Sequence, residues 1–261
     1  MCPLCPLCSL WLISVAKSKA RLDIVLVERG LAPSRERARA LILAGQVKVD
    51  GQVVSKAGAP VADLAQVELV AADHPYVGRG GIKLAHALEA FGLDPARRRA
   101  LDIGASTGGF TDVLLQRGAA SVVALDVGHG QLDWRLRTDP RVVVREGVNA
   151  RALTSADVPH AVDLVTIDVA FISLGHIFPA LPPFLAPNAD VVALVKPQFE
   201  AGRRDVGAHG LVTDPRVHEA VIARVTAQAD AAGLTRVGMT PSPITGATGN
   251  QEFFLHLKKS R

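Results

Sequence analysis

Hydrophobic residues follow two kinds of pattern in the longer, C-terminal part of the chain. Unbroken runs of Val, Leu, Ile and Ala alternate with stretches in which apolar residues recur every three or four positions. The unbroken runs are typical of strands in a parallel sheet covered on both faces, and the wider spacing predicts helices. The predicted strands are 100–104, 121–127, 141–145, 163–168, 190–195, 234–240 and 252–258, and the predicted helices are 82–91, 109–117, 131–137, 174–185 and 215–232. This alternation predicts an α/β fold with a doubly wound, mostly parallel sheet and an antiparallel last strand.

The pattern over residues 17–72 is that of a small α+β unit. A short helix ends at Gly30, and a second helix follows Ser34, which is a good N-cap residue. Alternating strand residues then flank an Asp50-Gly51 hairpin turn. Residues 73–81 show no periodic spacing of hydrophobic residues and contain a helix-breaking proline, so we expect a linker there.

Residues 1–16 fit neither pattern. They hold all three cysteines, Cys2, Cys5 and Cys8, with prolines in the gaps and no fourth metal ligand nearby. Their apolar run is shorter than a membrane span and has no basic region before it. We interpret this segment as a disordered extension, with metal or redox binding and targeting as alternatives. Because the remainder lacks cysteine, we expect a reducing compartment, the cytoplasm.

Composition and charge narrow the class of protein. The chain is 49% hydrophobic and 21% charged, which indicates a globular protein, and only 4% aromatic, which argues against a nucleic-acid surface built on aromatic stacking. Its net charge is +4, and residues 17–70 hold nine Lys/Arg against six Asp/Glu. Most of the excess positive charge therefore lies in the small N-terminal unit, as in a module that binds a polyanion.

A glycine-rich turn joins the first strand of the predicted sheet to the next helix. From Asp102 to Gly109 it reads Asp-x-Gly-x-x-x-Gly-Gly. Such glycines let the backbone approach a nucleotide-like ligand, toward which the first N–H groups of the helix point. The pattern is neither Gly-x-Gly-x-x-Gly nor a phosphate loop, because no Gly-Lys-Ser/Thr follows. An acid before the first glycine suits a ligand with an amino group; an ordinary tight turn is the alternative.

Charged residues end several of the other apolar strands. Asp126 ends the second about twenty residues after the glycine turn, a position that often binds ribose hydroxyls. Asp168 ends the fourth strand and Lys196 follows the fifth. Glu252 opens the last strand, so it reaches the same edge if that strand is antiparallel. Lys83, in the first turn of the preceding helix, could complete a Lys-Asp-Lys-Glu cluster; a structural ion pair is the alternative for the strand-end residues.

The small unit resembles the RNA-binding domain first seen in the S-four ribosomal protein. The resemblance is carried by Arg21-Leu22-Asp23, Ser34-Arg35-x-x-Ala38, Ile42-x-x-Gly45-x-Val47-x-Val49-Asp50-Gly51 and Val53. It implies contacts with RNA phosphates, for which the candidate residues are Arg21, Arg35, Arg37, Arg39 and Lys48, with Arg79 beyond the linker. A solvated helix face is the alternative for the three arginines at 35, 37 and 39.

The remainder resembles FtsJ-type S-adenosylmethionine-dependent RNA methyltransferases, and the whole arrangement resembles the TlyA family. The matching motifs are Gly78-Arg79-Gly80-Gly81-x-Lys83-Leu84, Asp102-Ile103-Gly104-x-Ser106-Thr107-Gly108-Gly109-Phe110-Thr111, Asp126-Val127-Gly128-x-Gly130-Gln131-Leu132, Asp168-Val169-x-Phe171-Ile172-Ser173-Leu174, Val195-Lys196-Pro197-Gln198-Phe199-Glu200 and Gly249-Asn250-x-Glu252-Phe253. The resemblance implies a Rossmann-like methyltransferase domain over 82–261, following the S-four-like domain over 17–72.

The same resemblance implies a site and a substrate. The family's catalytic tetrad falls on Lys83, Asp168, Lys196 and Glu252. The expected cofactor is S-adenosylmethionine, held by Asp102, Gly104, Ser106, Thr107, Gly108, Gly109, Phe110, Asp126, Val127, Glu146 and Asn149. The expected substrate is a ribose 2′-hydroxyl, on cytidine, of 16S or 23S ribosomal RNA, in ribosomal subunits.

The expected chemistry explains these residue types. A 2′-hydroxyl must lose its proton as it attacks, and two neighbouring lysines repel, which favours a neutral amine on one and leaves an ammonium on the other. We expect Lys196 to be the general base, with Lys83 as the runner-up and no metal required. Segment 198–210 could be a flap over the RNA. Alternatives are a non-catalytic RNA-binding ribosome-assembly factor and a membrane-lytic hemolysin.

Overall fold

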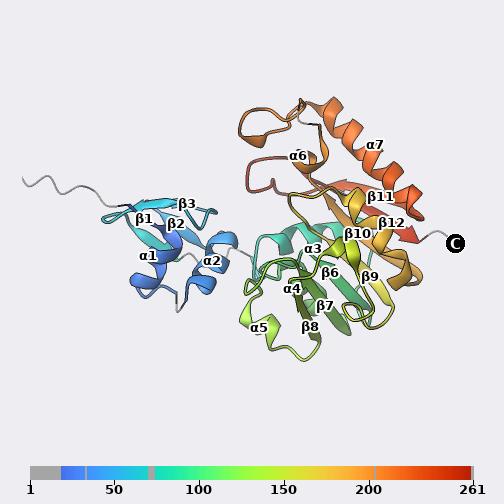
Figure 1. The fold of residues 1–261 in the computed structure, drawn as a ribbon, viewed down its shortest axis with the longest axis horizontal. Helices are drawn as coiled ribbons and strands as arrows, with labels where there is room; N and C mark the ends of the chain where they lie inside the picture. The colour runs from blue at the N-terminus through green and yellow to red at the C-terminus, as the bar shows by residue number, and fades with distance from the viewer. Residues whose placement is uncertain (1–18, 33, 70–73, 203, 260–261) are drawn as a thin grey trace, which may run out of the picture.

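The computed structural model describes residues 19–32, 34–69, 74–202 and 204–259. The predictions for residues 1–16, with Cys2, Cys5 and Cys8, lie outside these residues. Within them the chain forms a small unit and a larger unit, shown in blue and in teal to red in Figure 1.

In the described part of the larger unit, seven strands form one sheet in the order β11-β12-β10-β9-β6-β7-β8. The strands are β6 (Arg99–Ile103), β7 (Ser121–Asp126), β8 (Val142–Glu146), β9 (Val162–Ile167), β10 (Leu185–Val195), β11 (Leu234–Pro241) and β12 (Phe253–Lys259). Neighbouring strands from β8 to β10 are parallel, and β12 is antiparallel to both β10 and β11. The predicted doubly wound sheet with its antiparallel last strand is confirmed.

Helices cover both faces of this sheet. They are α3 (Gly80–Ala90), α4 (Gly109–Gln116), α5 (Trp134–Arg137), α6 (Pro197–Glu200) and α7 (Pro215–Ala231), with 3-10 turns η1 (Ala150–Ala152), η2 (Leu174–His176), η3 (Phe178–Ala180), η4 (Pro182–Phe184) and η5 (Ala208–Gly210). Strand side chains alternate between the two faces, as the pleat requires.

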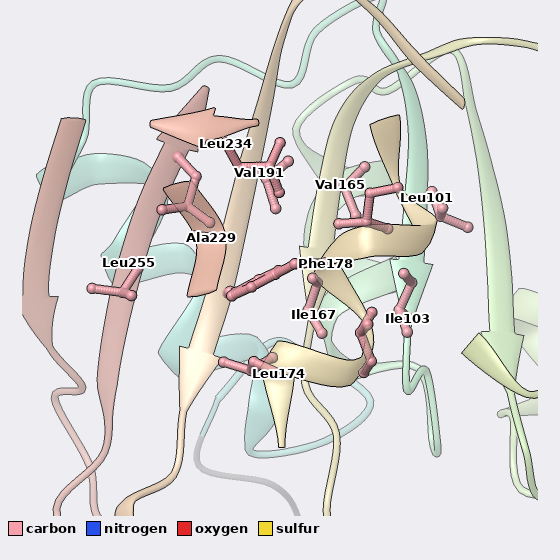
Figure 2. Packing of buried hydrophobic residues seen from close by; sticks show 14 of the residues in the cluster. Leu101, Ile103, Val165, Ile167, Leu174, Phe178, Val191, Ala229, Leu234 and Leu255 are labelled. Carbon is pink, nitrogen blue, oxygen red and sulfur yellow. The ribbon is translucent and has the colours of Figure 1, made fainter. Parts of the chain in front are cut away.

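The side chains on one face of the sheet pack against the 3-10 turns and α7. Figure 2 shows Phe178 of η3 among residues of neighbouring strands, including Ile167 and Val191. The side chains on the opposite face, for example Leu164 and Val192, pack against α3, α4 and α5. The two apolar layers explain why the strands read as unbroken hydrophobic runs.

One predicted helix is wrong. Residues 174–185 form three 3-10 turns instead, and β10 begins at Leu185 rather than at residue 190. Pro179, Pro182 and Pro183 cannot donate the N–H bonds that a continuous helix needs. The predicted helix over 131–137 is also shorter, because Asp133 accepts a bond from the N–H of Arg135 and thereby caps α5.

The small unit has the predicted α+β architecture. It consists of β1 (Lys19–Arg21), α1 (Leu22–Glu28), α2 (Arg35–Leu43), β2 (Val47–Val49), β3 (Gln52–Val53), β4 (Pro60–Ala62) and β5 (Val67–Leu69). Leu22, Leu26 and Ile42 form the centre of its own core. Ser34 caps α2 as predicted, accepting a bond from the N–H of Arg37 at 3.2 Å.

Among the helices in the described ranges, none has both the length and the apolar character needed to cross a membrane.

Candidate active site

The carboxyl ends of the parallel strands bring the predicted catalytic residues to one edge of the sheet. Asp168 directly follows β9, and Lys196 directly follows β10. Because Val195 lies opposite Phe253 in the antiparallel β10–β12 pair, Lys196 and Glu252 are also opposite one another. The helix α3 begins beside them, since a Cβ placed on Gly80 would lie 4.0 Å from Asp168 Oδ2.

The four residues form two ion pairs. Lys196 Nζ lies 2.5 Å from Asp168 Oδ1, and Lys83 Nζ lies 2.6 Å from Glu252 Oε2. The Lys83–Glu252 pair is buried, and the Lys196–Asp168 pair is more exposed. Buried ion pairs contribute little net stability, because desolvation offsets their attraction. Two such pairs side by side therefore indicate a site for chemistry rather than a means of holding the fold together.

A cavity of about 710 Å³ opens next to the Lys196–Asp168 pair. It is lined by Leu43, Ile103, Gly104, Ser106, Leu125, Asp126, Val127, Gln131, Val148, Asn149, Ala150, Arg151, Asp168, Val169, Ala170, Phe171, Ile172, Ile177 and Lys196. This volume lies in the range of small-molecule sites, and the cavity lies at the point where the strand order reverses between β6 and β9.

The glycine turn forms one wall of the cavity. Gly104 has φ +83°, and a Cβ there would stand 2.2 Å from the backbone oxygen of Asp168, so only glycine fits. The N–H of Ser106 donates to Asp126 Oδ2 at 2.8 Å, and the N–H of Gly128 donates to Asp126 Oδ1 at 2.7 Å. Asp126 thus fixes the turn to the end of β7 while lining the cavity.

Comparison with known proteins agrees with this geometry. The family profile described as FtsJ-like methyltransferase matches residues 76–259. The chain belongs to this family. The S4 domain profile matches residues 20–63 of the same methyltransferase.

Three relatives show how far the likeness extends. The methyltransferase is 50% identical over 241 residues to the 16S/23S rRNA (cytidine-2′-O)-methyltransferase TlyA of Mycobacterium tuberculosis, covering 92% of this chain and 90% of the relative. It is 40% identical to Hemolysin A of Brachyspira hyodysenteriae, covering 90% and 98%. A solved structure from Streptococcus thermophilus, of a protein named after the hemolysins, is 44% identical with a TM-score of 0.73 and covers 94% and 90%.

The methyltransferase uses S-adenosylmethionine, and the cavity fits this cofactor. The cavity has the volume of a small-molecule site, and its lining combines apolar side chains with Asp126 at the end of β7, as a nucleoside-like ligand requires. Gly104, Ser106, Asp126, Val127 and Asn149 are the predicted cofactor residues that line the cavity.

Several predicted cofactor residues do not line it. Thr107, Gly108, Gly109 and Phe110 lie in the turn or at the start of α4, and Phe110 packs against Phe254. Glu146, another predicted cofactor residue, accepts a bond from the N–H of Gly130 and pairs with Arg137.

Asp102, predicted to lie near a ligand amine, does not line the cavity, and its side chain is fully buried behind the turn. Its two carboxylate oxygens accept bonds from the hydroxyls of Thr111 at 2.7 Å and Thr166 at 2.9 Å. Burial raises the pKa of Asp102 to about 7, and the nearby charge of Asp168 acts in the same direction.

Other residues that line the cavity were not predicted from the sequence. Gln131 lines the cavity and accepts a bond from the Ser106 hydroxyl at 3.0 Å. Ala150 and Arg151 reach it from the turn after β8. Phe171 lines it with a ring that is 90% exposed on a residue with φ +64°. Gln131 and Phe171 carried a signal in the sequence, because they lie in the motifs that begin at Asp126 and Asp168.

Three of the predicted RNA-binding arginines surround one buried carboxylate. Asp23 is fully buried and pairs with Arg21 at 2.9 Å, Arg35 at 3.2 Å and Arg39 at 3.5 Å, all roughly half-exposed. The hydrogen bond from Arg21 is the largest effect that lowers the pKa of Asp23 to about 2. The arginines are therefore held in place with their outer sides in solvent. Lys48 lies half-buried on β2, opposite Glu68.

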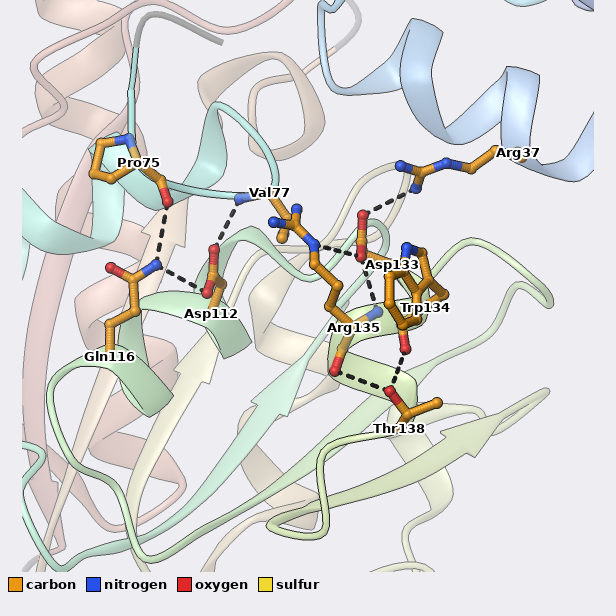
Figure 3. Close-up of polar contacts among 9 residues, drawn as sticks. All are labelled: Arg37, Pro75, Val77, Asp112, Gln116, Asp133, Trp134, Arg135 and Thr138. Atoms are coloured by element: carbon orange, nitrogen blue, oxygen red, sulfur yellow. Dashed lines mark hydrogen bonds and ion pairs between the residues drawn. The ribbon is translucent and has the colours of Figure 1, made fainter. Parts of the chain in front are cut away.

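Arg37 departs from the predicted basic face. Its guanidinium reaches from α2 to Asp133 Oδ2 at 2.9 Å, which ties the small unit to the methyltransferase unit (Figure 3). Arg79 is exposed, and its side chain lies against Gly45. Figure 3 also shows the N–H of Val77 donating to Asp112 of α4 at 2.8 Å.

Proposed function

We propose that this protein transfers a methyl group from S-adenosylmethionine to the 2′-hydroxyl of a cytidine in ribosomal RNA, within ribosomal subunits in the cytoplasm. The observation that carries this proposal is the pair Lys196–Asp168 on the cavity wall, beside the pair Lys83–Glu252. The names of the relatives support ribosomal RNA and cytidine, and the S4 match supports RNA as the class of substrate.

Lys196 is the residue we assign as general base. When bound, S-adenosylmethionine supplies a methyl group on a sulfonium that leaves as a neutral thioether. Lys196 Nζ takes the proton of the 2′-hydroxyl as that oxygen becomes the nucleophile. Asp168 Oδ1, 2.5 Å away, orients Nζ and stabilises the ammonium that forms.

Lys83 has a second electrostatic role. As an ammonium held by Glu252, it stabilises the negative charge that develops on the ribose oxygen. Its burial strengthens this interaction, because few waters screen it. The division of roles follows from position, since Lys196 lines the cavity and Lys83 lies behind it on α3.

The arginines around Asp23 are the residues we assign to RNA phosphates. Arg21, Arg35 and Arg39 present a fixed positive surface on the small unit, which suits binding to the backbone rather than to a base sequence. A target nucleotide inside a helix must be flipped out to reach Lys196.

Methyl transfer to ribosomal subunits tests the proposal. Subunits lacking the modification are incubated with tritiated S-adenosylmethionine and the wild-type protein, Lys196→Ala or Lys258→Ala. We expect Lys196→Ala to lower the rate by about 10²-fold or more, as loss of a general base does. Lys258→Ala is the matched control, because this half-exposed lysine on β12 pairs with Asp190, away from the site.

Alkaline hydrolysis of the labelled RNA identifies the methylated atom. A 2′-O-methyl group removes the neighbouring hydroxyl that alkali needs, so the label must appear in alkali-resistant dinucleotides. Label in mononucleotides would show methylation of a base and overturn the assignment. Binding without incorporation would instead support the non-catalytic assembly factor, and equal incorporation by wild type and Lys196→Ala would contradict the role of Lys196.

A further inference from the structure

Glu200 is a buried carboxylate that the mechanism above does not use. It ends α6, the short helix that begins directly after Lys196, and its side chain is only 2% exposed. Burying a carboxylate costs free energy unless its oxygens accept hydrogen bonds. Its bonding partners therefore indicate what the side chain holds in place.

The carboxylate bonds to the segment that follows Asp168. Glu200 Oε2 accepts a bond from the Ser173 hydroxyl, and Oε1 accepts one from the N–H of Leu174, both at 2.8 Å. Ser173 in turn caps η2 by accepting a bond from the N–H of Gly175 at 3.2 Å. Glu200 therefore joins the chain leaving β10 after Lys196 to the chain leaving β9 after Asp168.

Other contacts hold the same bridge. The rings of Phe171 and Phe199 lie 4.9 Å apart, centre to centre, between these two segments. Arg224 of α7 donates to the backbone oxygen of Glu200, and its guanidinium lies 4.0 Å from the carboxylate. Within α6, the N–H of Phe199 donates to the oxygen of Lys196 at 3.0 Å, so movement of Glu200 is transmitted to the lysine backbone.

We propose that Glu200 is a positioning residue that sets the separation of Lys196 and Asp168, and with it the position of Phe171 on the cavity wall. The role rests on the proposed function, because the two residues it positions are those assigned to proton transfer. A general base must lie within hydrogen-bond reach of its proton, and displacement by about 1 Å can cost 10²-fold in rate. Glu200 thus acts through its bonds to Ser173 and Leu174 without touching the reacting atoms.

Three variants separate positioning from general stability. Glu200→Ala removes both bonds, Ser173→Ala removes one, and Glu200→Gln keeps an acceptor for Leu174 in a side chain of the same shape. Asp190→Asn is the matched control, because Asp190 is also a buried carboxylate and is bonded to His256 and Arg98. It lies on β10 six residues before Lys196, which is about 20 Å away at the usual rise of a strand.

The readouts are kcat per folded protein, KM for ribosomal RNA, and the dissociation constant of S-adenosylmethionine by calorimetry. We expect Glu200→Ala to lower kcat by about tenfold or more while the dissociation constant stays within about twofold of wild type. Glu200→Gln should recover kcat to within about threefold of wild type, and Glu200→Ala with Ser173→Ala should be no slower than Glu200→Ala alone. Asp190→Asn should lower thermal stability and leave kcat unchanged.

Unchanged kcat in Glu200→Ala, or loss of kcat in parallel with cofactor affinity, would overturn the positioning role. If Glu200→Ala does not fold, Ser173→Ala decides: a kcat lowered by about threefold supports the role, and an unchanged kcat overturns it. Absence of RNA methylation by the wild-type protein would be a failure of the proposed function instead.

Discussion

Replacing Asp102 with asparagine tests whether this carboxyl group serves the fold or the cofactor. Asp102 is fully buried at the end of β6 and accepts bonds from Thr111 and Thr166. Burial raises its pKa from 3.8 to about 7 despite those two bonds. The folded protein therefore holds a proton on Asp102 at pH values where the unfolded chain has already released it.

The sign and size of the effect follow from that difference. Between about pH 4 and pH 7 the folded state binds more protons than the unfolded state at this position, so stability falls as the pH rises. A pKa raised from 3.8 to about 7 corresponds to about 4 kcal/mol, at about 1.4 kcal/mol per pH unit. Above about pH 8 the group is ionised in both states, and its contribution stops changing.

Urea denaturation of the wild-type protein and Asp102→Asn at pH 5, 6, 7 and 8 measures this effect. The amide resembles the protonated acid and does not titrate, so the variant should gain stability relative to wild type by about 2 kcal/mol from pH 5 to pH 7 and little beyond. Other groups titrate in both proteins and cancel in the difference. A difference that stays constant with pH would refute the reasoning.

Cofactor affinity of the same variant completes the test. Asp102→Asn should bind S-adenosylmethionine within about threefold of wild type, whereas Asp126→Asn, on the cavity wall, should bind about tenfold more weakly. A large loss of affinity in folded Asp102→Asn would show that the carboxylate contacts the cofactor, as the sequence analysis expected.

Two further substitutions test the turn and the contact between the units. Gly104→Ala should lower stability by about 2 kcal/mol or more and abolish cofactor binding, because the added methyl group would clash with the Asp168 backbone. Gly92→Ala is the control, because Gly92 also has a positive φ but no atom lies within 4 Å of the added methyl group. It should lower stability by about 1 kcal/mol and leave cofactor binding unchanged. Equal effects in the two variants would contradict the steric argument. Arg37→Ala and Asp133→Asn, measured singly and together by denaturation, should show a coupling free energy of about 1 kcal/mol; additive effects would mean that the ion pair contributes nothing.

The positions of Asp168 and Lys196 could be predicted because they depend on strand direction alone. Asp168 and Lys196 follow parallel strands, and the ends of such strands meet at one edge whatever the side chains are. Glu252 needed one further assumption, an antiparallel last strand, which the pairing of Val195 with Phe253 confirms. The pairing of Lys83 with Glu252 could not be predicted, because it depends on how α3 packs beside the sheet.

Alternation along β6 explains why the Asp102 side chain is buried and does not line the cavity. Leu101 and Ile103 belong to one apolar layer and Ala100 to the other, so Asp102 shares the parity of Ala100. It points into the layer that contains α4, where the Thr111 hydroxyl meets it. A residue at the end of a strand can therefore face the core rather than the cavity. Its face can be read from the residue two positions earlier, whose side chain lies on the same side of the strand.

The same periodic reasoning applies to the arginines of α2. Residues four apart lie on one face of a helix, whereas residues two apart lie on nearly opposite faces. Arg35 and Arg39 accordingly share Asp23, and Arg37 points the other way, to Asp133. The helical spacing thus indicates that these three arginines do not share one face of α2. The partner of Arg37 could not be predicted, because that contact joins residues 96 positions apart.

The position of Asp133 shows why a linker does not make the two units independent. Its side chain pairs with Arg37, and its N–H donates to the backbone oxygen of Thr107 in the glycine turn at 3.1 Å. Leu43, at the end of α2, also lines the cavity. The small unit therefore contacts the cavity through Leu43 and the glycine turn through Asp133. RNA bound at Arg35 and Arg39, as we propose, would be placed relative to the site by these contacts, and not only by the length of the connecting chain.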